Sequence, residues 1–166
     1  MRITAVALCL MSVVYSLEAR ENHIGVLDLE AQGVSVQEAK NITYRLCGEL
    51  ISSGRFTIFD RQAMAAALKE QGLKQSECTS ESCVAQAGKI IGVERMISGT
   101  VTNVAGRIKV RAKIHNVEDG TVLRSAQAEA EDMEQALQEA CPTVAEEFIA
   151  MENQRLASIT PQTWKR

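Results

Sequence analysis

Residues 56–101 read FTIFDRQAMAAALKEQGLKQSECTSESCVAQAGKIIGVERMISGTV, and this stretch decides the fold of the chain. It predicts a strand, two helices separated by a loop with paired cysteines, and a second strand. Gly72 and Gly92 lie where the two helices are expected to end, because glycine readily adopts the left-handed conformation that closes many helices. This order of elements is typical of an α/β fold.

The residues before this stretch predict one more strand and one more helix. The apolar run from His23 to Leu29 is of strand type. Ser35 and Glu38 then have the spacing of a capping box, which predicts a helix over residues 36–53 with one apolar stripe. Two strands joined through a helix pair in parallel, so residues 23–29 and 56–59 should be neighbours in the sheet.

The residues after this stretch predict an antiparallel meander and a final helix. Strands are expected over residues 96–104, 107–116 and 121–130, because tight turns separate them. A helix over residues 132–153 follows, and Pro142 inside it predicts a kink or a split, since proline has no backbone N–H. The whole order is β-α-β-α-α-β-β-β-α, an α/β fold with a mixed sheet of about five strands packed by helices.

The amino terminus has the pattern of a cleaved export signal. Residues 1–19 open with Met1 and the basic Arg2, continue as an apolar run and close with small-residue sites. Cys9 follows Leu8 inside the run, so we interpret it as part of the signal and not as a lipid anchor. The run is shorter than the roughly 20 residues that span a bilayer, and no later segment is long and apolar enough. We expect a periplasmic or secreted protein.

After the signal, the chain has the length of one domain. We expect this α/β domain over residues 20–153, followed by a mobile tail over residues 154–166. The net charge of -3 has no long block of one sign, which argues against a nucleic-acid partner. The sequence contains no arrangement typical of a catalytic site or a phosphate-binding loop, so we expect no enzyme activity and no cofactor.

Five short motifs occur in the order and spacing of a known family. They are Ile24–Leu29, Phe56–Arg61, Leu68–Gly72, Gly88–Val93 and Ile97–Val101. Over residues 23–123 the chain resembles the domain shared by the curli-secretion protein CsgG, the amino-terminal domain of TolB and the penicillin-binding-protein activator LpoB. The resemblance implies the same fold and a role in envelope assembly through binding another protein. CsgG builds its pore from long hairpins in this domain, whereas the turns here are tight, so we expect no curli-type channel.

Four cysteines remain after the signal, and an even number in an exported chain indicates disulfides. Cys78 and Cys83 could form a disulfide or half of a metal site. We favour the disulfide, because His23 and His115 are predicted on different strands without a second ligand beside them. Cys47 and Cys141 would then pair with each other, although four cysteines allow three connectivities.

Two sets of polar residues are candidates for binding. Asp28 and Asp60 follow two parallel strands, where open α/β sheets bind ligands, but helix capping would also account for them. Lys109, Arg111 and Lys113 alternate with apolar residues along one strand. They could form a partner surface or a solvated charge ladder with Glu129 and Glu131.

These observations favour an exported, non-enzymatic protein-binding or scaffold domain in bacterial envelope assembly or upkeep. We expect an envelope protein as partner, no nucleic acid, and a monomer or small homo-oligomer. The alternative is a periplasmic small-molecule-binding or sensor domain that uses the cleft near Asp28 and Asp60.

Overall fold

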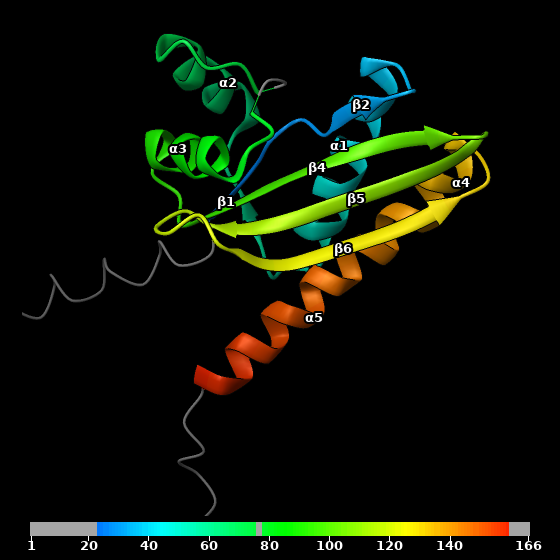
Figure 1. Cartoon of the computed structure of the whole chain (residues 1–166). Coiled ribbons are helices and arrows are strands. Elements are labelled where there is room, and N and C mark those ends of the chain that lie inside the picture. Colours follow the sequence, from blue (N-terminus) through cyan, green and yellow to red (C-terminus); the bar gives the residue numbers. More distant parts are fainter. Residues whose placement is uncertain (1–22, 76–77, 160–166) are drawn as a thin grey trace, which may run out of the picture.

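A mixed six-stranded sheet forms the centre of the computed structural model, which describes residues 23–75 and 78–159 (Figure 1). The elements follow in the order β1 (His23–Val26), β2 (Glu30–Gln32), α1 (Val36–Ser52), β3 (Thr57–Ile58), α2 (Arg61–Glu70), α3 (Glu81–Ile91), β4 (Arg95–Val104), β5 (Arg107–Asn116), β6 (Val122–Ala130), α4 (Met133–Gln135), the π-helix η4 (Ala136–Ala140) and α5 (Cys141–Ile159). The predicted α/β fold with a mixed sheet is confirmed.

The strand order is β3-β1-β4-β5-β6, and β2 also pairs with β4. β1 lies between β3 and β4 and is parallel to both, as the helix connections require. β4, β5 and β6 form the predicted antiparallel meander. β4 is therefore the strand at which the parallel and antiparallel halves of the sheet meet.

The predicted strand over residues 23–29 is split in two. Val26 pairs with Ile97, and the next pair joins Glu30 to Thr100. Three residues lie between Val26 and Glu30, but only two lie between Ile97 and Thr100. Such an extra residue is a β-bulge, which bends a strand and turns side chains outward. The bulge makes β2 a sixth strand and places Asp28 in the break between β1 and β2.

Helices cover both faces of the sheet, but unequally. α1 and α5 cover one face along its length, burying Ile97, Val101, Val110 and Ile114. α2 and α3 cover the other face over one end only, where Met96 packs with Met64 and Val84. In Figure 1, no helix lies in front of the part of β4, β5 and β6 that is farther from α2 and α3, and we call this side of the three strands the open face. Within the two described ranges, no helix is both long and apolar enough to span a bilayer.

The final helix differs from the predicted helix over residues 132–153 in two ways. Its first part widens into η4 immediately before Cys141 and Pro142, which agrees with the predicted irregularity, since a π-helical turn accommodates an interrupted hydrogen-bond ladder. α5 then continues to Ile159. The predicted mobile tail is therefore wrong for residues 154–159, which are helical. Residues 160–166 and the predicted signal over residues 1–19, with Cys9, lie outside the described part of the chain.

A buried ion pair anchors α5 to the sheet. The Arg95 guanidinium donates to the Glu152 carboxylate at 2.6 Å, and Arg155 reaches the same carboxylate at 2.7 Å. Burial by itself would raise the pKa of Glu152, but the hydrogen bonds from Arg155 and Arg95 outweigh it and hold the pKa below its usual value. The last turns of α5 are thus tied to the beginning of β4.

Helix α3 approaches β4 closely because Gly88 has no side chain. A Cβ at Gly88 would overlap Val117 Cγ2 and lie 2.9 Å from Met96 Cγ. Gly48, in the middle of α1, has no atom within 4 Å of the same position. The two helical glycines therefore differ in the space around them.

We expect Gly88→Ala to lower the free energy of unfolding by about 1–3 kcal/mol, because the methyl group forces α3 away from the sheet. Gly48→Ala is the matched control and should raise the free energy of unfolding by up to about 1 kcal/mol, since alanine is the better helix former. Urea denaturation followed by circular dichroism measures both. Equal effects of the two substitutions would contradict the close approach of α3.

Candidate functional site

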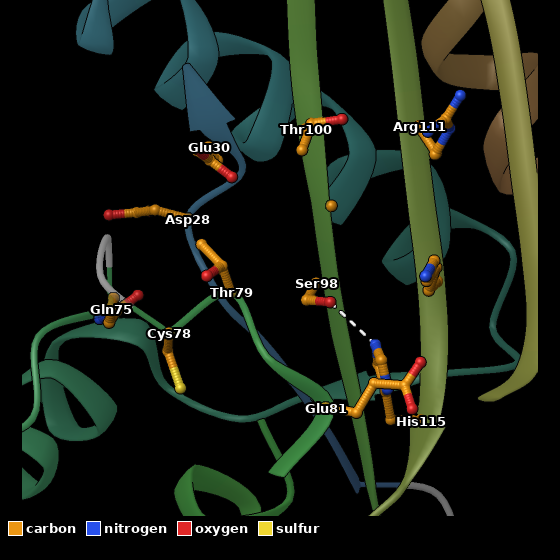
Figure 2. Close-up of a pocket in the computed structure, with 12 residues that line it drawn as sticks. Asp28, Glu30, Gln75, Cys78, Thr79, Glu81, Ser98, Thr100, Arg111 and His115 are labelled. Atoms are coloured by element: carbon orange, nitrogen blue, oxygen red, sulfur yellow. Dashed lines mark hydrogen bonds between the residues drawn. The ribbon is translucent and has the colours of Figure 1, made fainter. Parts of the chain in front are cut away.

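A pocket of about 150 Å³ lies where the cover of α2 and α3 over the sheet ends. Its floor is the polar face of β4 and β5, and its opposite side comes from the β1–β2 break and the segment before α3 (Figure 2). Twelve residues line it: Asp28, Glu30, Gln75, Cys78, Thr79, Glu81, Ser98, Gly99, Thr100, Arg111, Lys113 and His115. Polar and charged side chains thus dominate this hollow.

The two long sides of the pocket carry different side chains, and the carboxylate of Glu81 lies beside His115 at the β4–β5 side. Asp28, Glu30 and Gln75 lie together on one side in Figure 2, whereas Ser98 and Thr100 lie across from them on β4. The first group offers carboxylate and amide oxygens, and the second offers hydroxyl groups, with Arg111 and Lys113 behind them on β5. The strand alternation places these β4 and β5 side chains on one face.

His115 lies at one end of the pocket and is only 1% exposed. Its Nε2 is 2.8 Å from Ser98 Oγ, while no described atom forms a hydrogen bond with its Nδ1. Burial lowers the pKa of His115, and the nearby Lys113 charge acts in the same direction, whereas Glu81 and the Gly120 backbone oppose it. The ring is thus held in its neutral form over a wider pH range than a free imidazole.

Asp28 and Asp60, the two predicted cleft residues, are not brought together. Asp28 lines the pocket and forms an ion pair with Arg61. Arg61 also donates to Val26 O at 2.7 Å, so it fixes the end of β1. Asp60 instead caps α2 by accepting from Ala63 N at 2.7 Å, and it does not line the pocket. Asp60 is therefore a helix cap, and of the two residues only Asp28 lines the pocket.

Lys109, Arg111 and Lys113, the predicted partner surface, form a row along the open face of β5 together with Arg107. Lys109 pairs with Glu129 on β6 at 2.7 Å, and Arg111 donates to the neutral Gln127 at 3.3 Å. Lys113 forms no ion pair among the described residues. Glu131 follows the end of β6, where its backbone N–H binds Gln135. The predicted charge ladder thus exists for Lys109 alone.

Several pocket residues were not predicted as site residues: Glu30, Gln75, Glu81, Ser98, Thr100 and His115. For β4 a signal was present, because Ser98, Thr100 and Thr102 recur at every second position and mark a polar face. Within the described ranges, no group of three or more His, Cys, Asp or Glu side chains could hold a metal ion.

Comparison with known proteins assigns the chain to a family. Residues 10–112 match the family described as curli production assembly/transport component CsgG. The chain belongs to the CsgG family. A search of curated proteins found no match.

Solved structures share the fold at low sequence identity. The LpoB C-terminal domain from Salmonella enterica is 15% identical with a TM-score of 0.55, and the alignment covers 74% of this chain and 92% of that one. Lipoprotein GNA1162 from Neisseria meningitidis is 17% identical with a TM-score of 0.56, over 83% and 99% of the two chains. A PelC dodecamer from Paraburkholderia phytofirmans is 12% identical with a TM-score of 0.50, over 81% and 90%.

The cysteines of this CsgG-family chain follow only half of the predicted pairing. Cys78 and Cys83 form a disulfide beside the pocket. Cys47 and Cys141 are free and buried, so the predicted bridge between them is wrong. Cys141 Sγ lies 3.8 Å from Ile42 O, so it contacts the face of α1 that carries Ile42. Cys47 comes five residues after Ile42 and is therefore rotated from it by about 140° around the axis of α1. Both helices carry a cysteine, but the two side chains face different neighbours.

We expect two reactive thiols, those of Cys47 and Cys141, in denatured and unreduced protein comprising residues 20–166. In the native protein both should react slowly, because they are buried and burial raises the pKa of Cys141 to about 12. Mass spectrometry after alkylation, with and without denaturant, counts them. No alkylated cysteine after denaturation would restore the Cys47–Cys141 bridge, and four would remove the disulfide.

The depressed pKa of His115 should make the fold less stable in mild acid. Below about pH 6.5 the imidazole of His115 is protonated in the unfolded chain but still neutral in the folded chain. The free energy of unfolding therefore decreases as the pH falls from about 6.5 to the lower pKa of the folded state. His115→Gln should flatten this fall, because the substituted side chain does not titrate. Urea denaturation between pH 5 and pH 7.5 measures the slope, and identical slopes in wild type and His115→Gln would contradict the assignment.

Proposed function

We propose that this protein is an exported, non-enzymatic domain that binds another protein during assembly or upkeep of the bacterial envelope. Membership of the CsgG family, described as a curli production assembly/transport component, carries this proposal. The fold likeness to the LpoB domain and to lipoprotein GNA1162 supports it. The proposal includes removal of a signal over residues 1–19, a domain that extends from residue 20 to the end of α5 at residue 159, and a periplasmic or secreted location.

The open face of the sheet is the surface we assign to the partner. On β4, β5 and β6 this face carries four cations, at Arg107, Lys109, Arg111 and Lys113, and one carboxylate, at Glu129. The whole chain has a net charge of -3, so this row of cations has the opposite sign to the net charge of the chain. A partner surface with exposed Asp and Glu side chains is complementary to it.

Of the three predicted cations in this row, Arg111 and Lys113 are the two that form no ion pair among the described residues. Lys109 is already paired with Glu129, and an additional carboxylate would gain less there. Arg111 has only a neutral side-chain partner, Gln127. Charge-assisted hydrogen bonds from these two side chains would orient a partner on the sheet, and their contribution should weaken as salt rises.

The test is reversal of both charges, with a control of equal charge change. In vivo cross-linking in the native host, followed by purification of the captured protein, supplies the partner for affinity measurement. We expect Arg111→Glu with Lys113→Glu to weaken binding at least about tenfold, or about 1.4 kcal/mol. Arg55→Glu with Lys69→Glu changes the net charge equally, at exposed positions outside the open face, and should bind as wild type does.

Two outcomes would overturn the proposal. One is equal weakening by the two double variants, which would indicate a general charge effect in place of a docking surface. The other is a chain that cross-links to no envelope protein. Light scattering of the uncross-linked protein tests the accompanying expectation of a monomer or small homo-oligomer.

A further inference from the structure

We propose that His115, Ser98 and Glu81 form a pH-sensitive switch between the sheet and α3, in which acid creates an ion pair between the His115 imidazolium and the Glu81 carboxylate. The three residues come from β5, β4 and the first turn of α3, and they line one end of the pocket (Figure 2). The inference goes beyond protein docking, because it concerns the conformation of the domain itself.

The first step is the hydrogen bonding of the neutral ring. His115 is 1% exposed, its Nε2 is 2.8 Å from Ser98 Oγ, and its Nδ1 has no hydrogen-bond partner in the part of the chain that the structure describes. A neutral imidazole carries a proton on one nitrogen and a lone pair on the other. With the proton on Nε2, the ring donates to Ser98, and a lone pair at Nδ1 is all that stays unpaired.

The second step is the change that protonation brings. An imidazolium has an N–H on both nitrogens, so Nδ1 of His115 becomes a charged, buried donor without an acceptor. Leaving a charged donor unpaired costs more than leaving a neutral lone pair unpaired. The acid form of His115 therefore requires an acceptor that the neutral form does not require.

Glu81 is placed to be that acceptor. Its carboxylate lies beside His115 in Figure 2. The side chain is exposed and forms no ion pair among the described residues, so it can turn towards His115 without breaking another ion pair. A hydrogen bond between an imidazolium and a carboxylate is charge-assisted, and such bonds are stronger than neutral ones.

Two charged side chains act on His115, and they act in opposite directions. Burial lowers the pKa of His115 most strongly, the Glu81 charge on α3 raises it, and the Lys113 charge on the same strand lowers it. β4 contributes the neutral Ser98 hydroxyl, the turn before β6 contributes the Gly120 backbone, and the paired position on β6 is apolar. Glu81 is therefore the carboxylate that favours the charged ring.

Formation of the ion pair changes one end of the pocket. Glu81 begins α3, and Cys83 in the same turn is joined to Cys78 by the disulfide. We expect the disulfide to confine the movement to the Glu81 side chain and this first turn. Because Glu81 lines the pocket, acid draws its carboxylate onto β5 and holds the first turn of α3 against the sheet.

The titration of the His115 ring tests the pairing. The chain has two histidines, and NMR of their imidazole protons between pH 5 and pH 8 follows both, with His115→Gln identifying the signal of His115. We expect Glu81→Gln to shift the midpoint of His115 to lower pH, because the charged ring loses its acceptor. Glu30→Gln is the matched control and should leave the midpoint unchanged, since Glu30 lines the same pocket but does not act on His115. An unchanged midpoint in Glu81→Gln, or an equal shift in the two variants, would overturn the proposal.

The backbone amides in the first turn of α3 test the movement. In the wild type we expect the amide chemical shifts of Ser82 and Cys83 to change with the same midpoint as the His115 ring. In Glu81→Gln the ring still titrates, but these amide shifts should no longer follow it. Amide shifts that do not follow the ring in the wild type, or that follow it equally in Glu81→Gln, would reject the switch. Neither measurement uses a partner, so the result is independent of the docking surface proposed above.

Discussion

The alternation of buried and polar side chains along β4 and β5 is the constraint on which the other features depend. Alternate residues such as Ile97, Val101 and Ile114 face α1 and α5, so those helices bury one face along its length. The intervening residues of β4 change from Met96, which packs under α3, to Ser98 and Thr100, which do not. The cover of α2 and α3 therefore ends at this point, and both the pocket and the open basic face lie beyond it.

The break between β1 and β2 supplies the opposite side of the pocket. Gly99 lies opposite this break, where a Cβ would overlap Arg111 O and lie 2.9 Å from Leu29 Cδ2. Arg61 fixes the break from the other direction, since it holds Val26 O and the Asp28 carboxylate and lies 5.0 Å from the centroid of the Tyr44 ring. A bulge held by a glycine and an arginine turns Asp28 away from the ladder, which a regular strand would not do.

Two covalent or ionic contacts limit the motion of the elements around the pocket. The Cys78–Cys83 disulfide joins the preceding segment to the first turn of α3, so it fixes the part of the pocket that includes Thr79 and Glu81. At the other face, the buried Arg95–Glu152 pair ties α5 to β4. The floor and one side of the pocket are therefore held by contacts within the chain.

The order of elements, the family and the polar face of β5 could be predicted from the sequence, because these depend on local periodicity and on glycine and capping positions. The sequence also indicated the Cys78–Cys83 disulfide, which closes a short loop. The bulge before β2, the separation of Asp28 from Asp60 and the free state of Cys47 and Cys141 became evident only in the folded chain. These features depend on strand register and on the rotation of one helix against another, which residues distant in the chain impose on each other. The same holds for the pocket, since Glu30, Ser98 and Lys113 meet only when β2 and β5 pair with opposite edges of β4.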